Sequence, residues 1–399
     1  MKKTTRIDIA DSLRGFAVLV ILLLHCMLHF NYFVFPESSG LPIVDVIDTT
    51  LFIIAFLFFI SKAKFIFAML FGLSFFIQEN NQRKKGKNFT YRFLWRLFIL
   101  FGFGILNGSF YNGDILVVFA SIGVLLPLLV RLETKTLTIL AVILLIFNPI
   151  IWTRSLYPII GIENPLIDYQ EWLLTDNKEI LLNENILTIL QSNIGTVSFD
   201  LIVSSWLGGT AQTFLAYFII GIIIGRKKLL IYSSFKMLIW KKVVIISGIT
   251  ALSLYLFIGH IHLNKSEIIY NIFPIINHFS CIFATIFVIG IFIILYYKKE
   301  KLRLILNKLI PYGKMSLTNY VAQSIIGTFI FHPWGLNLSD KLGNTYSVLI
   351  GIGIFLLQYY FSCWWLKSHK QGPLEAIWKK LTWIQLPKLK LNQERSDIE

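Results

Sequence analysis

Long apolar stretches separated by clusters of Lys and Arg run through the whole of this sequence. A helix needs roughly 20 apolar residues to cross the hydrocarbon core of a bilayer. Within lipid, only helices and closed barrels satisfy all of their backbone hydrogen bonds. The pattern therefore predicts an all-α fold, a polytopic bundle of transmembrane helices. Ten spans are expected, near residues 13–34, 60–78, 93–111, 115–130, 136–152, 201–225, 243–262, 271–297, 315–334 and 346–366.

The composition favours one integral membrane domain that covers residues 1–399. Hydrophobic residues make up 56% of the chain and charged residues only 15%, whereas an ordinary globular protein has about 25% charged residues. So few charges cannot form the polar shell of a soluble core, and lipid is expected to cover the apolar surface. The formal net charge of +15 is expected to come from basic cytoplasmic loops rather than from nucleic-acid binding.

The distribution of Lys and Arg along the ten spans predicts their orientation. If the N-terminus is cytoplasmic, 31 of the 37 Lys and Arg residues fall on the cytoplasmic side. The positive-inside rule then predicts that both termini are cytoplasmic. Two further lysines, Lys62 and Lys64, lie where the second span begins. Only four fall on the outer side: Arg154, Lys178, Lys265 and Lys341.

Three segments outside the regular spans have a distinct character. The outer loop at residues 153–200 carries seven acidic residues against two basic ones, and its apolar residues recur at helical spacing. A helix lying on the outer surface is expected there. Residues 46–61 are apolar and end at a Ser-Lys pair, so they are expected to form a half-helix or re-entrant piece. Residues 384–399 are expected to be a polar cytoplasmic tail.

Several site types are excluded by the residues that would be needed. Cys26, Cys281 and Cys363 are far apart and each lies in an apolar stretch, so neither a disulfide framework nor a zinc site is expected. We expect no metal. The sequence contains no Walker loop, no HExxH motif, no kinase motifs and no nucleophile elbow. The apolar run from Leu13 is too long for a signal peptide, so it is expected to be a retained first span.

Polar residues inside the first span are the main functional candidates, because such residues are costly in lipid unless they face the bundle or a cavity. On a helix that advances ~100° per residue, Asp11, Arg14 and His25 share one face. His29 is one turn beyond His25. At ~1.5 Å per residue, His25 lies roughly 16 Å from Arg14, which places the arginine at the cytoplasmic mouth.

An alternative reading of these residues is purely structural. In that reading Asp11 caps the helix, Arg14 reaches lipid phosphates, and His25 is a buried histidine with satisfied hydrogen bonds.

Weaker candidates lie in other spans. Asn107 and Asp114 flank the turn between the third and fourth spans, and Asn319 and Gln323 lie within the ninth. We consider them as substrate contacts together with His29. Their alternative roles are a helix cap for Asp114 and interhelical hydrogen bonds for the amides. Two further polar residues within spans are His278 and Gln358.

Five blocks of the sequence resemble the YeiB-like family of bacterial membrane proteins, which is catalogued as a domain of unknown function. The first block is RIDIADSLRGFAVLVILLLH at the N-terminus. The others are KFIFAMLFGLSF at 64–75, NGDILVVFASIGVLL at 112–126, GKMSLTNYVAQSII at 313–326 and GPLEAIWKKLTW at 372–383. The resemblance implies a multi-pass protein of the bacterial cell membrane. The family pattern has Leu in place of Ala10, more often Asn at the position of His25, and commonly His at that of Asn107.

The family in turn resembles a wider group of transmembrane acyltransferases, which share an Asp-x-x-Arg-Gly opening. In the acyltransferase-three proteins a histidine eleven residues after that Arg is taken as the catalytic base, and here this position is His25. The resemblance implies transfer of an acyl group from cytoplasmic acyl-CoA to an acceptor on the outer side. The acceptor could be a glycan, a lipid or a small molecule. His25 would be the base, Arg14 would hold the donor phosphates, and Asp11 would orient Arg14.

Two other functions stay open. The same polar residues could line the path of a membrane transporter or flippase, although the sequence has no obvious internal repeat. The chain could also be a non-enzymatic membrane component that contacts partners through its acidic outer loop. The lipid bilayer is the one partner that the composition itself predicts.

Overall fold

A computed structural model describes residues 8–30, 41–111, 113–162, 185–194, 198–264, 271–339 and 341–384. Every regular element within these residues is a helix, as the sequence predicts. The first half comprises α1 (Asp8–Leu24), the π-helix η1 (His25–His29), α2 (Pro42–Phe58), α3 (Lys62–Arg83), α4 (Thr90–Phe110), α5 (Leu116–Gly123), α6 (Leu126–Leu129), α7 (Thr134–Ile146), α8 (Pro149–Ile159) and α10 (Ile186–Ser192). The second half comprises α11 (Ser198–Leu207), α12 (Thr210–Arg226), α13 (Ser234–Asn264), α15 (Phe273–Lys298), α16 (Glu300–Asn307), α17 (Ile310–Lys314), α18 (Ser316–Phe331), α19 (Asn344–Ser368) and α20 (Pro373–Thr382).

Seven helices among the described residues are long and apolar enough to cross a membrane, and the number rises to eight if the bent pair α11 and α12 forms one span. The chain is therefore a membrane protein. The predicted spans at 115–130 and 315–334 correspond to shorter elements, namely α5 with α6, and α18. The count of ten spans and the cytoplasmic location of both termini stay predictions.

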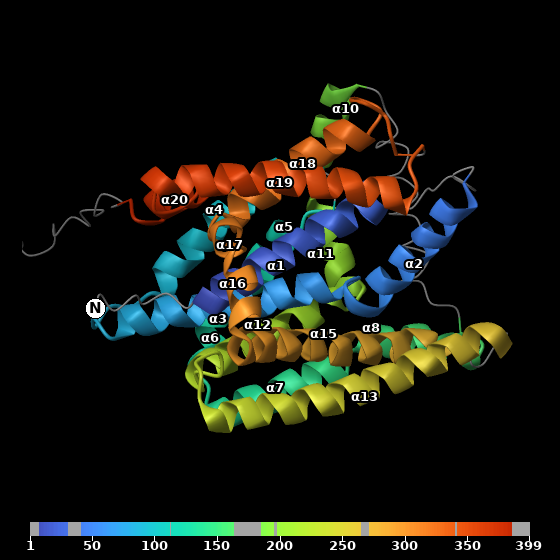
Figure 1. Cartoon of the computed structure of the whole chain (residues 1–399). Helices are drawn as coiled ribbons and strands as arrows, with labels where there is room; N and C mark the ends of the chain where they lie inside the picture. Colours follow the sequence, from blue (N-terminus) through green and yellow to red (C-terminus); the bar gives the residue numbers. More distant parts are fainter. Residues whose placement is uncertain are drawn as a thin grey trace, which may run out of the picture.

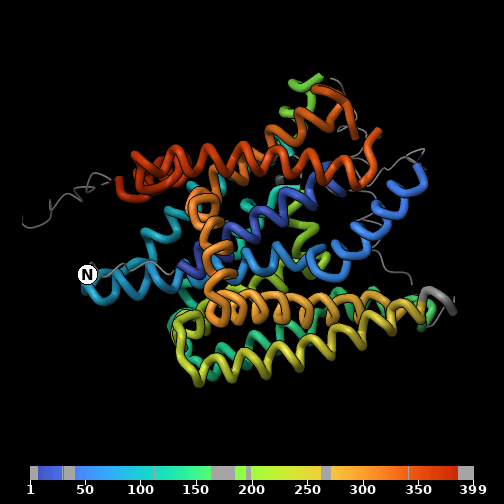
Figure 2. Tube along the Cα trace, in the orientation of Figure 1, coloured from blue at the N-terminus to red at the C-terminus, as the bar shows by residue number. Residues whose placement is uncertain are grey.

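Helix α1 crosses the middle of the bundle, with α19 on one side and α15 on the other (Figures 1 and 2). It also packs against α3, α17 and α18. The contact with α17 is close because Gly15 faces Gly313, and a Cβ atom on Gly15 would overlap the Leu309 carbonyl oxygen. Small residues permit this approach of two backbones, which in lipid is a main source of helix association.

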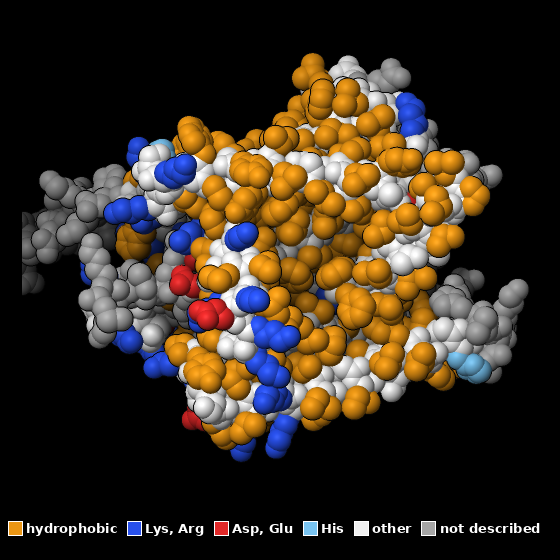
Figure 3. All heavy atoms as spheres, in the orientation of Figure 1, with side chains coloured by type: hydrophobic (Ala, Val, Ile, Leu, Met, Phe, Trp, Pro, Cys, Tyr) orange, Lys and Arg blue, Asp and Glu red, His pale blue; other side chains and the backbone are white. Residues whose placement is uncertain are grey.

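The outer helices turn large hydrophobic side chains away from the bundle, and Figure 3 shows such side chains across the broad middle of one face. Lys and Arg side chains gather over one end of the same face (Figure 3). Two cavities at this end collect basic residues from segments far apart in the sequence, and we call it the basic end. It is defined by Arg14, Arg83, Arg131, Arg226, Lys314 and Lys379.

Two boundaries differ from the sequence prediction. Helix α8 continues to Ile159, so the outer loop begins later than residue 153, because Pro149 at the start of α8 and the apolar residues after it extend the helix. Of the predicted surface helix, α10 is described at Ile186–Ser192, and residues 163–184 lie outside the described residues. Most of the predicted polar tail, residues 385–399, also lies outside them.

The apolar segment before the second span forms a 17-residue helix, α2, which begins at Pro42 rather than at residue 46. Its half-helix or re-entrant character stays a prediction. The chain breaks between Phe58 and Lys62, where Ser61 has a φ of 66°. The buried ammonium of Lys62 donates to the Phe56 carbonyl, and Tyr255 donates to that of Leu57 at 3.0 Å. These bonds satisfy carbonyls that the break frees within an apolar environment.

Candidate functional site

A cavity of about 600 Å³ opens at the basic end, between α1, α3, α4, α18 and α20. Its volume falls in the range of about 300–1,000 Å³ that is typical of small-molecule sites. One part of its wall is apolar and aromatic. The polar part is formed by Asp11, Arg14, Ser74, Gln78, Arg96, Lys314, Ser316, Tyr320, Gln371, Glu375 and Lys379.

Arg14 is held in a fixed orientation at this cavity. Its Nη1 donates to Asp11 Oδ1 at 2.8 Å, and its Nη2 donates to Ser74 Oγ at 2.9 Å. The Asp11 side chain is 4% exposed, whereas that of Arg14 is 20% exposed. Asp11 lies within α1, which is described from Asp8 onward, and its carboxylate pairs with Arg14. The guanidinium therefore keeps one edge toward the cavity with its direction fixed by two partners.

Helix α20 closes one side of the cavity. The Glu375 carboxylate accepts hydrogen bonds from the backbone N–H groups of Leu317 and Thr318, at 2.7 and 3.2 Å, and so caps α18. Burial raises the pKa of Glu375 above its ordinary value, and these hydrogen bonds oppose the rise. The Arg96 guanidinium lies 3.5 Å from the centroid of the Trp378 ring, a cation–π contact. The wall therefore depends on a helix close to the end of the chain.

Two lysines leave positive charge available at the cavity. Lys314 and Lys379 line it, and neither has a hydrogen-bond acceptor among the described residues. Asp11 is paired with Arg14, and Glu375 faces the α18 terminus. The cavity thus combines an apolar wall with a surplus of cations, a combination suited to an amphipathic anion.

His25 begins the π-helical turn that ends α1, and its side chain is buried. The imidazole is surrounded by aromatic rings, with centroid distances of 4.8 Å to Tyr111, 5.4 Å to Phe30 and 6.3 Å to Tyr320. Single π-helical turns of this kind occur often at functional sites. His25 is not part of the wall of the Arg14 cavity among the described residues, but Tyr320 belongs to that wall and contacts His25.

The same tyrosine reaches the turn between α4 and α5. The Ile115 N–H donates to the Tyr320 hydroxyl at 3.3 Å. Asn107 Nδ2 donates to Asp114 Oδ1 at 2.9 Å, and the Leu116 N–H donates to Asp114 Oδ2 at 3.0 Å. Asp114 therefore caps α5, as its alternative reading expects. Tyr320 connects the cavity, the histidine and this turn.

The remaining candidates lie around the same helix. Asn319 Nδ2 donates to the Tyr312 carbonyl and to Ser362 Oγ, both at 3.1 Å, so its amide bridges helices. Gln323 is fully buried, and its amide has no hydrogen-bond partner among the described residues. The His29 side chain lies outside the described residues.

Sequence reasoning missed Ser74, Arg96, Tyr320 and Glu375 as site residues. Three of them occur in the blocks that carry the family resemblance, and Arg96 had no comparable signal. All five blocks contribute residues to the wall of the Arg14 cavity, although they are spread from the beginning of the chain to its last described helix. The blocks therefore mark one place in the structure.

Comparisons with known proteins agree with this resemblance. Residues 224–385 match the family described as "Protein of unknown function (DUF418)". The chain is 25% identical to "Uncharacterized protein YxaH" of Bacillus subtilis, over 95% of this chain and 94% of that protein. It is 26% identical to an "Uncharacterized 39.9 kDa protein in amylase 3'region" of Bacillus acidopullulyticus, again over 95% and 94%.

A shorter match connects the chain with Escherichia coli. It is 39% identical to "Uncharacterized protein YeiB" over 71 residues, which are 18% of each chain. No solved structure matches the chain. The family match over residues 224–385, these relatives and the shared sequence blocks all support the resemblance of the chain to the YeiB-like, DUF418 family.

Proposed function

We propose that the protein is a transmembrane acyltransferase of the bacterial cell membrane that takes its acyl group from a cytoplasmic acyl-CoA. The observation that carries the proposal is the position of Tyr320, which lines the Arg14 cavity and also contacts His25. A cationic cavity for a donor and a buried base are thereby separated by one aromatic side chain.

The donor would bind from the basic end. Arg14, Lys314 and Lys379 would face its phosphates, and the apolar wall would hold the acyl arm. The fixed guanidinium of Arg14 suits this task, because its planar fork matches phosphate oxygens. The thioester would then lie against Tyr320.

The acceptor would reach His25 from the outer side, past Tyr111 and the Asp114 turn. His25 would take the proton of an acceptor hydroxyl or amine while the oxygen or nitrogen of the acceptor attacks the thioester carbonyl. An ester or amide bond forms, the carbon–sulfur bond breaks, and the CoA thiolate leaves and receives the proton. The Tyr320 hydroxyl is a candidate donor to the developing oxyanion. Gln323 and His29 stay candidate acceptor contacts.

A membrane transporter or flippase is the second candidate, and the broken helices favour it. The pair α11 and α12 is bent by 83°, and α2 and α3 are separated by the break at Ser61. Discontinuous helices often form substrate sites in transporters. The buried base next to a cationic cavity favours acyl transfer over this reading.

The test uses inverted membrane vesicles that contain the full chain and are supplied with acetyl-labelled acetyl-CoA. We expect label to enter a membrane or luminal acceptor. His25→Asn should lower the transfer rate by about 10²- to 10⁴-fold, the usual contribution of a general base. Binding of acetyl-CoA to the purified variant should stay close to that of the unaltered protein, because His25 does not line the cavity.

His278→Asn is the matched control, since His278 bonds the Leu145 carbonyl and neither residue is among the described residues of the cavity wall. This variant should keep the transfer rate. Full transfer by His25→Asn would remove His25 from the mechanism. If the unaltered protein neither binds acetyl-CoA nor transfers label, acyl transfer is wrong, and uptake measurements in the same vesicles would test the transporter reading.

A further inference from the structure

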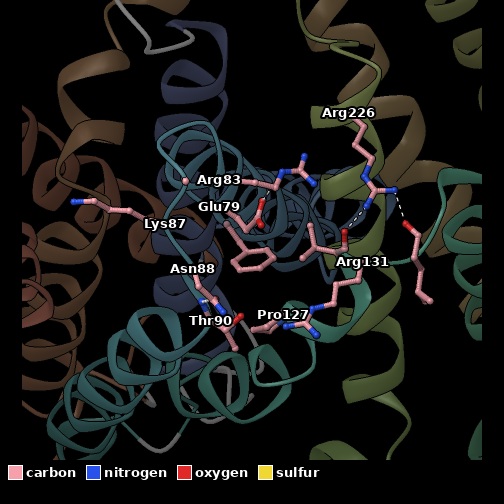
Figure 4. Close-up of a pocket in the computed structure, with 12 residues that line it drawn as sticks. Glu79, Arg83, Lys87, Asn88, Thr90, Pro127, Arg131 and Arg226 are labelled. Atoms are coloured by element: carbon pink, nitrogen blue, oxygen red, sulfur yellow. Dashed lines mark hydrogen bonds and ion pairs between the residues drawn. The ribbon is translucent and has the colours of Figure 1, made fainter.

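A second cavity of about 620 Å³ lies at the basic end, next to the first. Figure 4 shows it between the end of α3, the start of α4, the segment after α6 and the end of α12. Of the residues that the structure describes, Phe75 alone lines both cavities. The proposed acyl transfer makes no use of this second cavity.

Four basic side chains line it, and they come from four separate segments. Arg83 ends α3, Lys87 precedes α4, Arg131 follows α6, and Arg226 ends α12. Figure 4 shows Arg83, Arg131 and Arg226 around one space, while Lys87 lies at the opposite rim with its amine directed away. The positive-inside rule requires basic residues on this side of the membrane. It does not require three segments to bring arginines to the same concavity.

Arg226 is anchored in the wall of the cavity. Its Nη2 donates to the Val130 carbonyl at 2.6 Å, and its Nη1 donates to the Leu132 carbonyl at 2.7 Å. These bonds join α12 to the segment that carries Arg131. Both arginines thereby line one cavity, where a bound anion would offset part of their positive charge.

Among the described residues, four basic side chains and one acidic residue line the cavity, so this part of its wall has a net positive charge. Glu79 lies 4.0 Å from Arg83 and compensates at most one of the four bases. Asn88 and Thr90 add neutral hydrogen-bonding groups to the wall. Arginine forks match the oxygens of a phosphate group, and a phosphate carries enough negative charge to balance several of them.

We propose that this second cavity binds a phosphate group, carried either by a small soluble anion or by the headgroup of an anionic phospholipid. Arg131 and Arg83 contact the phosphate oxygens, and Arg226 supplies a fixed positive charge behind them. The site stands independently of the acyl-transfer proposal, because none of the described charged residues lines both cavities.

The test measures binding of inorganic pyrophosphate to the full chain in a neutral detergent by calorimetry. The informative variant is Arg83→Gln/Arg131→Gln. The Arg83 side chain is 67% exposed and Arg131 is exposed, so this variant should fold. Loss of two charge-assisted contacts should weaken binding about tenfold or more. Arg226 is left unchanged because its substitution would remove wall contacts as well as charge.

The matched control is Lys84→Gln/Lys135→Gln, which removes the same charge from exposed neighbours that do not line the cavity. It should keep its affinity within about twofold, since exposed charges outside the site are screened by salt. Glu79→Gln should strengthen pyrophosphate binding, because Glu79 is the one acidic residue among the described residues of the wall. Weaker pyrophosphate binding after Glu79→Gln would mean that the positive charge of the wall does not drive binding, and would overturn the proposal.

A second arm separates the two sources of phosphate. In phosphatidylcholine nanodiscs pyrophosphate should bind, and added phosphatidylglycerol should displace it if a lipid headgroup is the natural ligand. Unchanged binding in phosphatidylglycerol nanodiscs supports a soluble anion. Equal weakening in the lining variant and the control variant, or no binding by the unaltered protein in either detergent or nanodiscs, would overturn the proposal.

Discussion

Helices α1 and α13 have similar hydropathy, but α1 is buried within the bundle and α13 is largely exposed on its outside. Their most apolar windows have mean hydropathy of 1.8 and 2.0, yet 78% of that window is buried in α1 and only 22% in α13. Helix α1 is enclosed by α3, α15, α17, α18 and α19, whereas α13 packs mainly on α15. Leu13 of α1 is fully buried, while Leu256 of α13 is 67% exposed.

The difference shows that the hydropathy of a helix does not determine whether it lies at the centre of a bundle in lipid. Lipid tails are as apolar as leucine, so helix association depends on close packing and on polar contacts between helices. Helix α1 has both, through Gly15 at the α17 contact and through the Asp11, Arg14 and Ser74 hydrogen bonds. In α13, Gly248 packs against the Phe287 side chain of α15, whereas a Cβ atom on Gly259 would lie in open space.

The largest expected effect is a difference in cysteine labelling that reports the orientation of the chain. Both α1 and α13 are predicted to begin at the cytoplasmic side. After Cys26, Cys281 and Cys363 are replaced, a cysteine at Lys341 should react with an impermeant reagent in intact cells. A cysteine at Lys84 should react only after permeabilisation. Labelling with the two positions exchanged would reverse the predicted orientation, and with it the sides of donor and acceptor.

The next effect is on stability at the two glycines. Gly15→Ala should destabilise the protein by about 1–3 kcal/mol, because the new Cβ atom forces α1 away from the α17 backbone. Gly259→Ala should be neutral or stabilise by up to about 1 kcal/mol, since alanine favours a helix and meets open space there. Thermal unfolding in detergent measures both. Shifts of the same sign would show that close packing does not distinguish α1 from α13.

A smaller effect is expected at the polar contact of α1. Arg14→Lys keeps the charge but cannot bond both Asp11 and Ser74 in the same geometry, so it should destabilise by about 1–2 kcal/mol. It should also weaken acetyl-CoA binding. The Lys, Gln and Ala variants of Arg14 could all lose the same stability while the Lys variant keeps its full affinity for acetyl-CoA. That result would assign Arg14 a structural role alone.

The smallest effect is expected at Glu375, in the wall of the Arg14 cavity. Glu375→Gln should destabilise by about 1 kcal/mol, because the neutral amide is a weaker cap for α18 than a carboxylate. Glu300→Gln is the matched control, since its side chain is 78% exposed and pairs only with Arg303. Unfolding temperatures that fall equally in both variants would argue against the capping role.

The sequence indicated candidate site residues where they lie close together in one segment. Asp11, Arg14 and His25 follow from polar residues at helical spacing in one apolar run, and the structure places them along α1 and its π-helical end. Asp114 and Asn319 were recognised as polar, but their hydrogen-bond partners depend on other helices. Tyr320 gave no signal of its own, since a tyrosine in an apolar helix is ordinary until its neighbours are known.

The sequence by itself determined the all-α membrane fold, because bilayer thickness and the demand for internal hydrogen bonds act on each stretch separately. It also determined which stretches carry basic ends. The tertiary structure decided that α1 rather than α13 is central, and that five distant blocks meet at one cavity. It also decided that Arg83, Arg131 and Arg226 surround a second one. These outcomes depend on contacts between residues far apart in the sequence, such as Gly15 with Leu309 and Tyr320 with Ile115.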